Sequence, residues 1–345
     1  MSKVNRIDHF VKTGDTGLPI FFLQLGSRTS LFFDKVLKQA ALTNGTENVF
    51  VLTDVNFDQY RAYNCIDISR YAFGSLEFDG LYKHHSTNSY FFEKTCFDRW
   101  FMINAMIREL KIDHFFYADC DVLIMEKLQP VHAQMISGGY EGSTMYFEGG
   151  EGKSVTSAHT SFWSSKLLDD FCRFICAKYK DKAAFNKLLR DTLAGKYLDN
   201  TNLSDMILLD AFRTETKPRV FNLFTLEESG ICFDFNANVA YNGHQHTFVM
   251  NPAHRIKKFT KVGGGLVGRV TASAADVMYC KFYTVHFQGY ITKSLIPVYV
   301  TALTKKEAIK NQIVGEYNFA VRKMKLLKNK VKRTAVAMTG RARSM

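Results

Sequence analysis

The fold of this chain is decided by the stretch Phe115-Phe116-Tyr117-Ala118-Asp119-Cys120-Asp121-Val122-Leu123, in which two acidic residues separate two apolar runs. A short run of apolar and aromatic residues is typical of a buried β-strand. When two carboxylates emerge directly from such a strand, the absence of a cation beside them would carry a large free-energy cost. At positions i and i+2 they can reach one hard divalent cation together. The alternative is a purely structural pair that caps a turn or binds an arginine.

Short apolar runs alternate with longer amphipathic segments on both sides of this stretch. This alternation predicts an α/β fold with a mixed, mostly parallel sheet flanked by helices, whose ligands bind at the carboxyl ends of the strands. Gly26 and Asp54 follow the first two expected strands. The expected strands are residues 19–25, 49–52, 115–118 and 122–125, and the expected helices include residues 30–43 and 91–110.

Composition indicates a globular protein. The chain has 345 residues, of which 46% are hydrophobic and 23% charged, which suits one or two domains and excludes a disordered chain. Seven scattered cysteines without a Cys-X-X-Cys pair argue against a disulfide framework or a structural zinc site. No apolar run is long enough to span a membrane, and residues 1–9 lack the apolar stretch of a secretory signal. We therefore expect a cytoplasmic protein.

The positive charge is concentrated at the C-terminus. The formal net charge is +12, and nine cations with no acid lie between Arg322 and Arg343. Apolar residues are interleaved with them, so residues 305–345 are expected to form a basic amphipathic tail. Such a tail can hold the protein on the anionic inner face of a membrane through residues 322–345. The alternatives are a solvated tail without a partner and, less favoured, a segment that binds nucleic acid.

The residues around the acidic pair resemble a known family. The segment that begins at Phe97-Asp98-Arg99-Trp100-Phe101 and runs to Asp119-Cys120-Asp121 resembles the donor-binding segment of GT-A glycosyltransferases, which carry an Asp-X-Asp motif. Glycogenin-like enzymes and bacterial lipopolysaccharide glycosyltransferases are the nearest named relatives. The resemblance implies that the motif holds Mn²⁺ or Mg²⁺, which bridges the phosphates of a nucleotide-sugar expected to be UDP-linked. Arg99 matches an arginine that reaches this donor.

The resemblance also implies a division of the chain. Residues 1–304 would form a GT-A (Rossmann-like) domain, with the donor-binding half at about 18–125 and the acceptor half at about 155–300. Acceptor contacts are expected at about residues 233–246, where aromatic and polar residues are mixed.

A second match lies at Phe282-Tyr283-Thr284-Val285-His286-Phe287-Gln288-Gly289-Tyr290-Ile291-Thr292-Lys293, which resembles the His-X-X-Gly-X-X-Lys element of the family with one extra residue before the lysine. The resemblance implies that His286 is the third metal ligand beside Asp119 and Asp121. It implies further that Gln288, Gly289 and Lys293 contact the nucleotide-sugar, because glycine admits a close backbone approach and lysine neutralises phosphate charge.

The remaining candidates are position matches to the same family. His159 and Thr160 match residues beside the sugar, and Asp205 matches an acidic residue that faces the reacting centre. Asp205 also fits a structural role as an acid in the first turn of a helix. Matches to the binding site of the base and ribose are Gln24, Gly26 and Asp54.

Together these residues predict a hexosyltransferase that extends a glycan or lipid-linked acceptor in cell-surface polysaccharide synthesis. Asp205 would be the general base of an inverting enzyme, or would stabilise the oxocarbenium-like centre of a retaining one. The second motif favours retention. The alternatives are a metal-dependent phosphodiesterase or nuclease that uses the same carboxylates, and a nucleic-acid-binding protein that acts through its basic tail.

Overall fold

The computed structural model describes residues 17–27, 30–148, 154–197, 202–242, 247–271, 277–301 and 304–342. Its centre is a seven-stranded sheet with the order β3-β2-β1-β4-β7-β6-β8. The first four of these strands pair in parallel, and β7 is antiparallel to both its neighbours. The strands are β1 Ile20–Gln24, β2 Val49–Thr53, β3 Asn64–Asp67, β4 His114–Ala118, β6 Gly142–Glu148, β7 Ser154–Ser164 and β8 Val220–Asn222.

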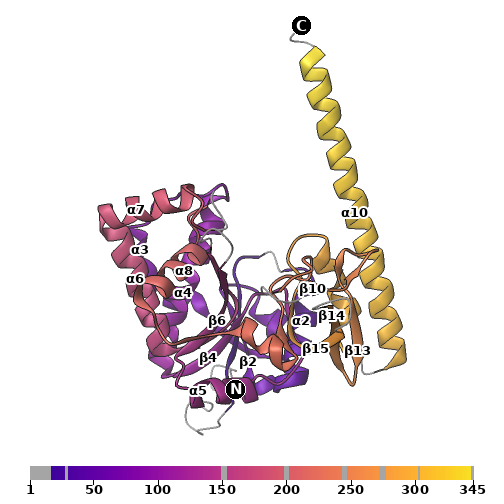
Figure 1. Cartoon of the computed structure of the whole chain (residues 1–345), viewed down its shortest axis with the longest axis horizontal. Helices are drawn as coiled ribbons and strands as arrows, with labels where there is room; N and C mark the ends of the chain where they lie inside the picture. Colours follow the sequence, from indigo (N-terminus) through magenta and orange to yellow (C-terminus); the bar gives the residue numbers. More distant parts are fainter. Residues whose placement is uncertain are drawn as a thin grey trace.

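Each face of this sheet is covered by its own apolar core. On β1, Phe21 packs with the helices of one face, whereas Ile20 and Phe22 belong to the core on the other face. This alternation is the two-residue period of a strand that is buried on both sides. The first face carries α4 Tyr90–Leu110, α6 Ser165–Lys180, α7 Lys182–Leu193 and α8 Asp205–Thr216, which gather on one side of Figure 1.

The opposite face is covered by helix α2 and by a second sheet. This sheet has the order β10-β14-β15-β5, with β13 beside β14 and β9 beside β15. β5 starts directly after Asp121 and pairs antiparallel with β15, so that Val122 lies opposite His286. The pairing therefore brings the second motif of the sequence to the first. The strands are β5 Val122–Ile124, β9 Ile231–Phe233, β10 Thr247–Phe248, β13 Phe259–Val262, β14 Gly265–Thr271 and β15 Val277–His286.

The shorter elements connect these layers. The two-stranded sheet of β11 and β12 lies apart from the others, and the 3₁₀ segments lie at residues 46–48, 57–60, 68–75, 223–229 and 292–295. The remaining elements are α2 Phe33–Asn44, α3 Leu76–Asp79, α5 Gln129–Ser137, α9 Ile296–Tyr299, β11 Met250–Asn251 and β12 Ile256–Lys257.

The chain ends in a long helix, α10, over Lys305–Ala342. Its first half packs on the body through Asn311 and Phe319, both buried, and through Gly315, where an added Cβ would meet Val298. Its second half extends away from the body (Figure 1). Within the described residues, no helix is both long and apolar enough to span a membrane.

The expected fold class is confirmed. The structure is α/β, with a mostly parallel mixed sheet flanked by helices and a helical, basic C-terminal tail. The helix expected at 91–110 is α4, and the helix expected at 30–43 begins only at Phe33, after Phe32 in the left-handed conformation. The expectation for residues 1–9 lies outside the described residues.

Candidate active site

Asp119, Asp121 and His286 come together where the two sheets meet. Each residue offers a ligand atom, and the three atoms lie within 4.8 Å of one another. His286 Nε2 is 3.5 Å from Asp121 Oδ1. His286 Nδ1 is 2.8 Å from the carbonyl oxygen of Phe235, to which an N–H at this position donates. That hydrogen bond orients the ring so that Nε2 faces Asp121, and Nε2 is the nitrogen that a metal would use.

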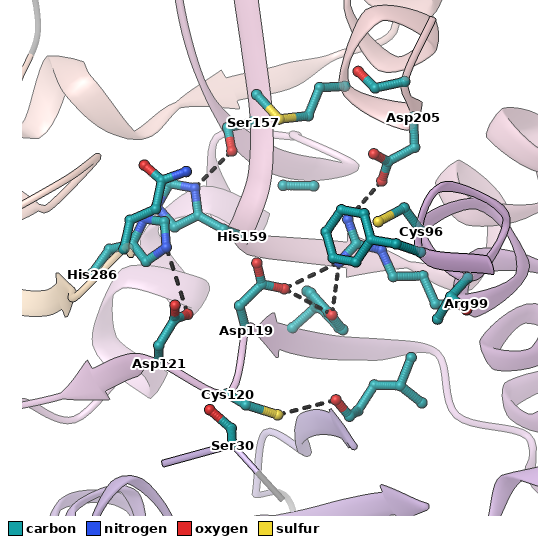
Figure 2. Close-up of a pocket in the computed structure, with 18 of the residues that line it drawn as sticks. Ser30, Cys96, Arg99, Asp119, Cys120, Asp121, Ser157, His159, Asp205 and His286 are labelled. Atoms are coloured by element: carbon teal, nitrogen blue, oxygen red, sulfur yellow. Dashed lines mark hydrogen bonds and ion pairs between the residues drawn. The ribbon is translucent and has the colours of Figure 1, made fainter. Parts of the chain in front are cut away.

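This donor set suits a hard divalent cation. Two carboxylates and one imidazole fit Mn²⁺ or Mg²⁺ better than a soft ion, which prefers thiolates. Cys120 lies between the two acids, but its thiol points to the carbonyl oxygen of Leu23, 3.0 Å away (Figure 2). Burial raises the pKa of this thiol well above its ordinary value, so it is a neutral packing group.

Arg99 of α4 joins two of the acidic side chains. Its guanidinium is 3.1 Å from Asp119 Oδ1 and 2.6 Å from Asp205 Oδ2. The aromatic rings of Trp100 and Tyr117 lie 4.6 and 5.2 Å from it. Figure 2 shows the arginine between the two carboxylates. Because the guanidinium is only 13% exposed, its charge is screened little by water and orients both acids.

Hydrogen bonds complete the environment of both acids. The Tyr117 hydroxyl donates to Asp119 Oδ1 over 2.9 Å, and the Trp100 indole N–H donates to Asp205 Oδ2 over 2.8 Å. Burial alone would raise the pKa of Asp119, but Arg99 and the nearby histidines, with the tyrosine hydrogen bond, hold it below its ordinary value. Asp119 is therefore an anion at neutral pH and available to a cation.

Lys293 supplies the second cation of the site. Its ammonium lies 2.9 Å from Asp121 Oδ2, and Lys293 belongs to the 3₁₀ segment 292–295, which comes just after the turn that follows β15. Gly289 has a φ of +94° in this turn, a conformation that favours glycine. Asn238 donates a hydrogen bond of 2.9 Å to the carbonyl oxygen of Gln288 and so ties the turn to the body. Gln288, Gly289 and Lys293 are thus presented together beside the acidic pair.

His159 lies on β7 beside the metal-ligand candidates. Its ring is stacked on that of His286, with centroids 4.1 Å apart, and Ser157 Oγ lies 2.6 Å from its Nδ1. Burial and the neighbouring His286 lower the pKa of His159 to about 3, so the ring is neutral at physiological pH. It can therefore offer hydrogen bonds and an aromatic face without adding charge.

A single cavity of about 580 Å³ collects most of these side chains. Its size is that of a small-molecule site. Gly26, Asp54 and Thr160 do not line it: the Gly26 N–H donates to Asp54 Oδ1 over 2.7 Å, and Thr160 is fully buried in β7. The candidates that do line it are Gln24, Arg99, Asp119, Asp121, His159, Asp205, His286, Gln288, Gly289 and Lys293.

A buried ion pair behind the cavity supports His286. Lys257 and Asp234 pair with their side chains fully buried. Asp234 Oδ2 accepts a 3.0 Å hydrogen bond from the backbone N–H of His286, and its carbonyl oxygen lies 3.1 Å from His159 Nε2. Sequence reasoning missed this pair, and it also missed the hydrogen-bond donors Tyr117 and Trp100. In the sequence, Asp234 at the end of a strand indicates a buried ion pair only weakly, and Lys257, far along the chain, does not indicate one at all.

Comparison with known proteins gives structural matches only. No family model matches the chain, and no curated protein matches its sequence. Similar solved structures include apo xyloside xylosyltransferase 1 from mouse, at 10% identity and a TM-score of 0.44, covering 60% of this chain and 85% of that one. A glycosyltransferase involved in glycosylating the major capsid of PBCV-1 matches at 13% identity and a TM-score of 0.27, with 52% and 80% covered.

The glycosyltransferase GlyE of Streptococcus pneumoniae matches at 11% identity and a TM-score of 0.29, covering 62% of this chain and 47% of that one. At such identities and TM-scores, activity has to be argued from the side chains of the site.

Replacing Lys257 with methionine is expected to destabilise the fold by about 3–5 kcal/mol, because it leaves the buried carboxylate of Asp234 without its cation. The measurement is the free energy of unfolding in urea. The double variant Lys257→Met/Asp234→Asn is expected to recover part of the loss, since it removes the unpaired charge. A loss below about 1 kcal/mol in the single variant would contradict this assignment.

Proposed function

We propose that the protein is a metal-dependent glycosyltransferase of the hexosyltransferase type, which transfers a sugar from a nucleoside-diphosphate sugar, expected to be UDP-linked, to a glycan or glycolipid acceptor in cell-surface polysaccharide synthesis. The observation that carries the proposal is the content of one cavity. It holds three candidate cation ligands, the adjacent Lys293, and the Arg99–Asp205 pair.

The cation-site end of the cavity suits a diphosphate. Transfer of a glycosyl group leaves negative charge on the departing diphosphate, and stabilising that charge is the main demand on the site. Mn²⁺ or Mg²⁺ held by Asp119, Asp121 and His286 would supply Lewis-acid charge there. Lys293 adds a further positive charge, and Gly289 admits the close approach of phosphate oxygens to the backbone.

Asp205 suits the stabilisation of positive charge at the reacting sugar carbon. Its Oδ2 accepts from Arg99 and Trp100, so in the described part of the chain Oδ1 is left for a substrate. A carboxylate so firmly held by a guanidinium and an indole is a better electrostatic partner than a proton acceptor. This favours the retaining course, in which the departing phosphate takes the proton of the acceptor hydroxyl.

The phosphodiesterase or nuclease alternative finds less support. Such hydrolysis commonly uses two metal ions about 4 Å apart, which requires additional ligands. Among the described residues, Asp119, Asp121 and His286 form the one group of three or more candidate ligands.

Asp121→Asn is expected to weaken Mn²⁺-dependent binding of UDP at least about tenfold, because the cation loses a charged ligand. The measurement is calorimetric titration with UDP, GDP and CDP, each with and without Mn²⁺. Asp113→Asn is the control, since Asp113 is exposed and lies at the other end of β4, away from the acidic pair. Equal affinity in wild type and Asp121→Asn would refute the ligand assignment. Hydrolysis of bis(p-nitrophenyl) phosphate without nucleotide binding would favour the phosphodiesterase.

Asp205→Asn is expected to lower the turnover of UDP-sugar about 10²-fold or more while changing UDP affinity little, because the amide cannot stabilise positive charge in the transition state. Steady-state hydrolysis or transfer, compared with calorimetric UDP binding, separates the two effects. Glu215→Gln on the exposed end of α8 is the control. Near-normal turnover of Asp205→Asn would leave Asp205 with a helix-terminal structural role.

The surface of α10 supports a membrane-facing role within this proposal, at the inner face of a membrane. Ile313, Tyr317, Met324 and Leu327 are each more than half exposed, and their spacing places them on one face of the helix. Four exposed lysines lie within the same stretch, at positions 323, 325, 328 and 330. An exposed apolar stripe beside lysines is suited to an anionic lipid surface.

The double variant Lys325→Glu/Lys328→Glu is expected to bind vesicles containing phosphatidylserine at least about tenfold more weakly than wild type, since each lysine near an anionic surface contributes about 1 kcal/mol. Vesicle co-sedimentation measures this. Lys127→Glu/Lys258→Glu, which reverses two exposed lysines of the body, is the control. Equal loss in both double variants, or salt-dependent binding to RNA in place of vesicles, would contradict the membrane role.

A further inference from the structure

The cavity has a second end, which the residues named so far leave unexplained. Asn88, Phe92, Thr95, Cys96 and Arg99 all line it. Their spacing of three and four residues places them on one face of α4 and its entry. Arg99 reaches Asp119 and Asp205 at the inner end of this face. Phe92 lies two turns before Arg99, ~10 Å along the helix axis, and therefore at the outer end.

Two apolar side chains that are partly open to solvent, Phe92 and Met206, line the cavity. Phe92 is 59% exposed although it lines a cavity, and Met206 lines the same cavity one residue after Asp205. An aromatic ring that is partly open to solvent offers a flat apolar face to a ligand. Asn88, Thr95 and Ser204 add polar atoms around it. The mixture of one flat apolar face and several hydrogen-bonding groups fits a sugar ring, which has an apolar C–H face and hydroxyls at its edge.

The charges of the lining argue against a phosphorylated occupant at this end. Among the described lining residues, the lysine and arginine side chains are Lys293 and Arg99, and both contact the acids of the cation site. The outer end instead carries Glu93, which is only 1% exposed and accepts hydrogen bonds from Ser86 and Asn88. A phosphate or carboxylate placed there would face an anion without a compensating cation.

Hydrogen bonds fix the outer end of the cavity relative to Asp205. Asn202 Oδ1 accepts hydrogen bonds from the backbone N–H and the hydroxyl of Thr87, and the hydroxyl oxygen of Ser86 lies 3.0 Å from it. The Leu203 N–H donates to the carbonyl oxygen of His85 over 2.7 Å. The segment that enters α4 is thus bound to the segment that enters α8, where Asp205 lies. A ligand on Phe92 would have a fixed position relative to Asp205.

We propose that Phe92 and Met206 form the acceptor subsite, and that the acceptor presents an uncharged sugar ring there. The inference rests on the proposed glycosyltransferase function and extends it, because it places acceptor recognition between α4 of the donor-binding half and the start of α8 in the acceptor half, and specifies a neutral sugar. The reacting hydroxyl of this sugar would enter between the ring of Phe92 and the Arg99–Asp205 pair. Any phosphate of a lipid-linked acceptor would lie further out.

The test compares Phe92→Ala with Phe91→Ala. Phe91 is 81% exposed on the same helical turn but does not line the cavity, so it controls for the loss of an exposed phenylalanine. Saturation-transfer NMR with UDP and Mn²⁺ present measures binding of methyl β-glucoside, methyl β-galactoside and methyl β-xyloside, with glucose 6-phosphate as the charged probe. Calorimetric UDP titration is run on each variant.

Wild type is expected to bind at least one neutral glycoside more tightly than glucose 6-phosphate. Phe92→Ala is expected to weaken this binding about tenfold more than it weakens UDP binding, while Phe91→Ala and Phe92→Tyr retain it. Equal effects of Phe91→Ala and Phe92→Ala, preference for the charged probe, or UDP binding without any glycoside binding would overturn the inference. Absence of UDP binding by wild type would instead overturn the proposed function.

Discussion

The ion pairs of Arg99 are the interaction on which the candidate site depends. Three carboxylates, those of Asp119, Asp121 and Asp205, converge at the cation-site end of the cavity, and like charges so close together would repel one another or take up protons. Arg99 contacts two of them, Asp119 and Asp205, and Lys293 contacts the third. The guanidinium fork allows one side chain to serve both acids at once. Because Arg99 is held by two aromatic rings, its geometry is set by packing before any ligand binds.

Strand pairing sets up this charge arrangement. Asp119 ends a strand of the first sheet, and Asp121 precedes β5, which belongs to the second sheet. The chain therefore passes from the first sheet to the second at Asp119 and Asp121. The antiparallel register of β5 with β15 places His286 opposite Val122 and fixes it beside Asp121. The buried Asp234–Lys257 pair then holds the backbone of His286 from behind. Displacing β15 by one residue would turn the imidazole away from the acids.

The sequence is sufficient to predict the parts of the site that depend on local pattern. An apolar strand followed by Asp119 and Asp121 predicts two carboxylates that emerge from a buried strand, and the amphipathic segment before it predicts the helix that carries Arg99. His286 has no such local signal, and only resemblance to a family placed it. In the sequence, Asp205 has the pattern of an ordinary acid in the first turn of a helix, and its contact with Arg99 becomes visible only in the structure.

Other features of the site depend on contacts between segments that are distant in the sequence, and the hydrophobic periodicity of the sequence does not predict such contacts. Asp234 and Lys257 form a pair only because their segments pack behind β15. Phe92 is one of three consecutive aromatic residues at the start of α4, and only the direction of each side chain tells which one lines the cavity. Gly26 and Asp54 lie at the ends of two neighbouring strands, and their 2.7 Å hydrogen bond joins residues 28 apart in the sequence. Their predicted contact with the base and ribose stays a prediction.

Helix α10 contacts the turn next to the candidate site. Arg322 of α10 lies 3.8 Å from the ring centroid of Tyr290 and also donates to the carbonyl oxygen of that residue. Tyr290 follows Gly289 in the turn that leads into the 3₁₀ segment with Lys293. One turn before Arg322, Phe319 is buried against the body, so the projecting half of α10 continues a segment that is firmly packed. A rigid helix that is packed at one end transmits its orientation to the other end, because its backbone hydrogen bonds resist bending. A surface that binds the projecting half would therefore also fix the direction in which the cavity opens.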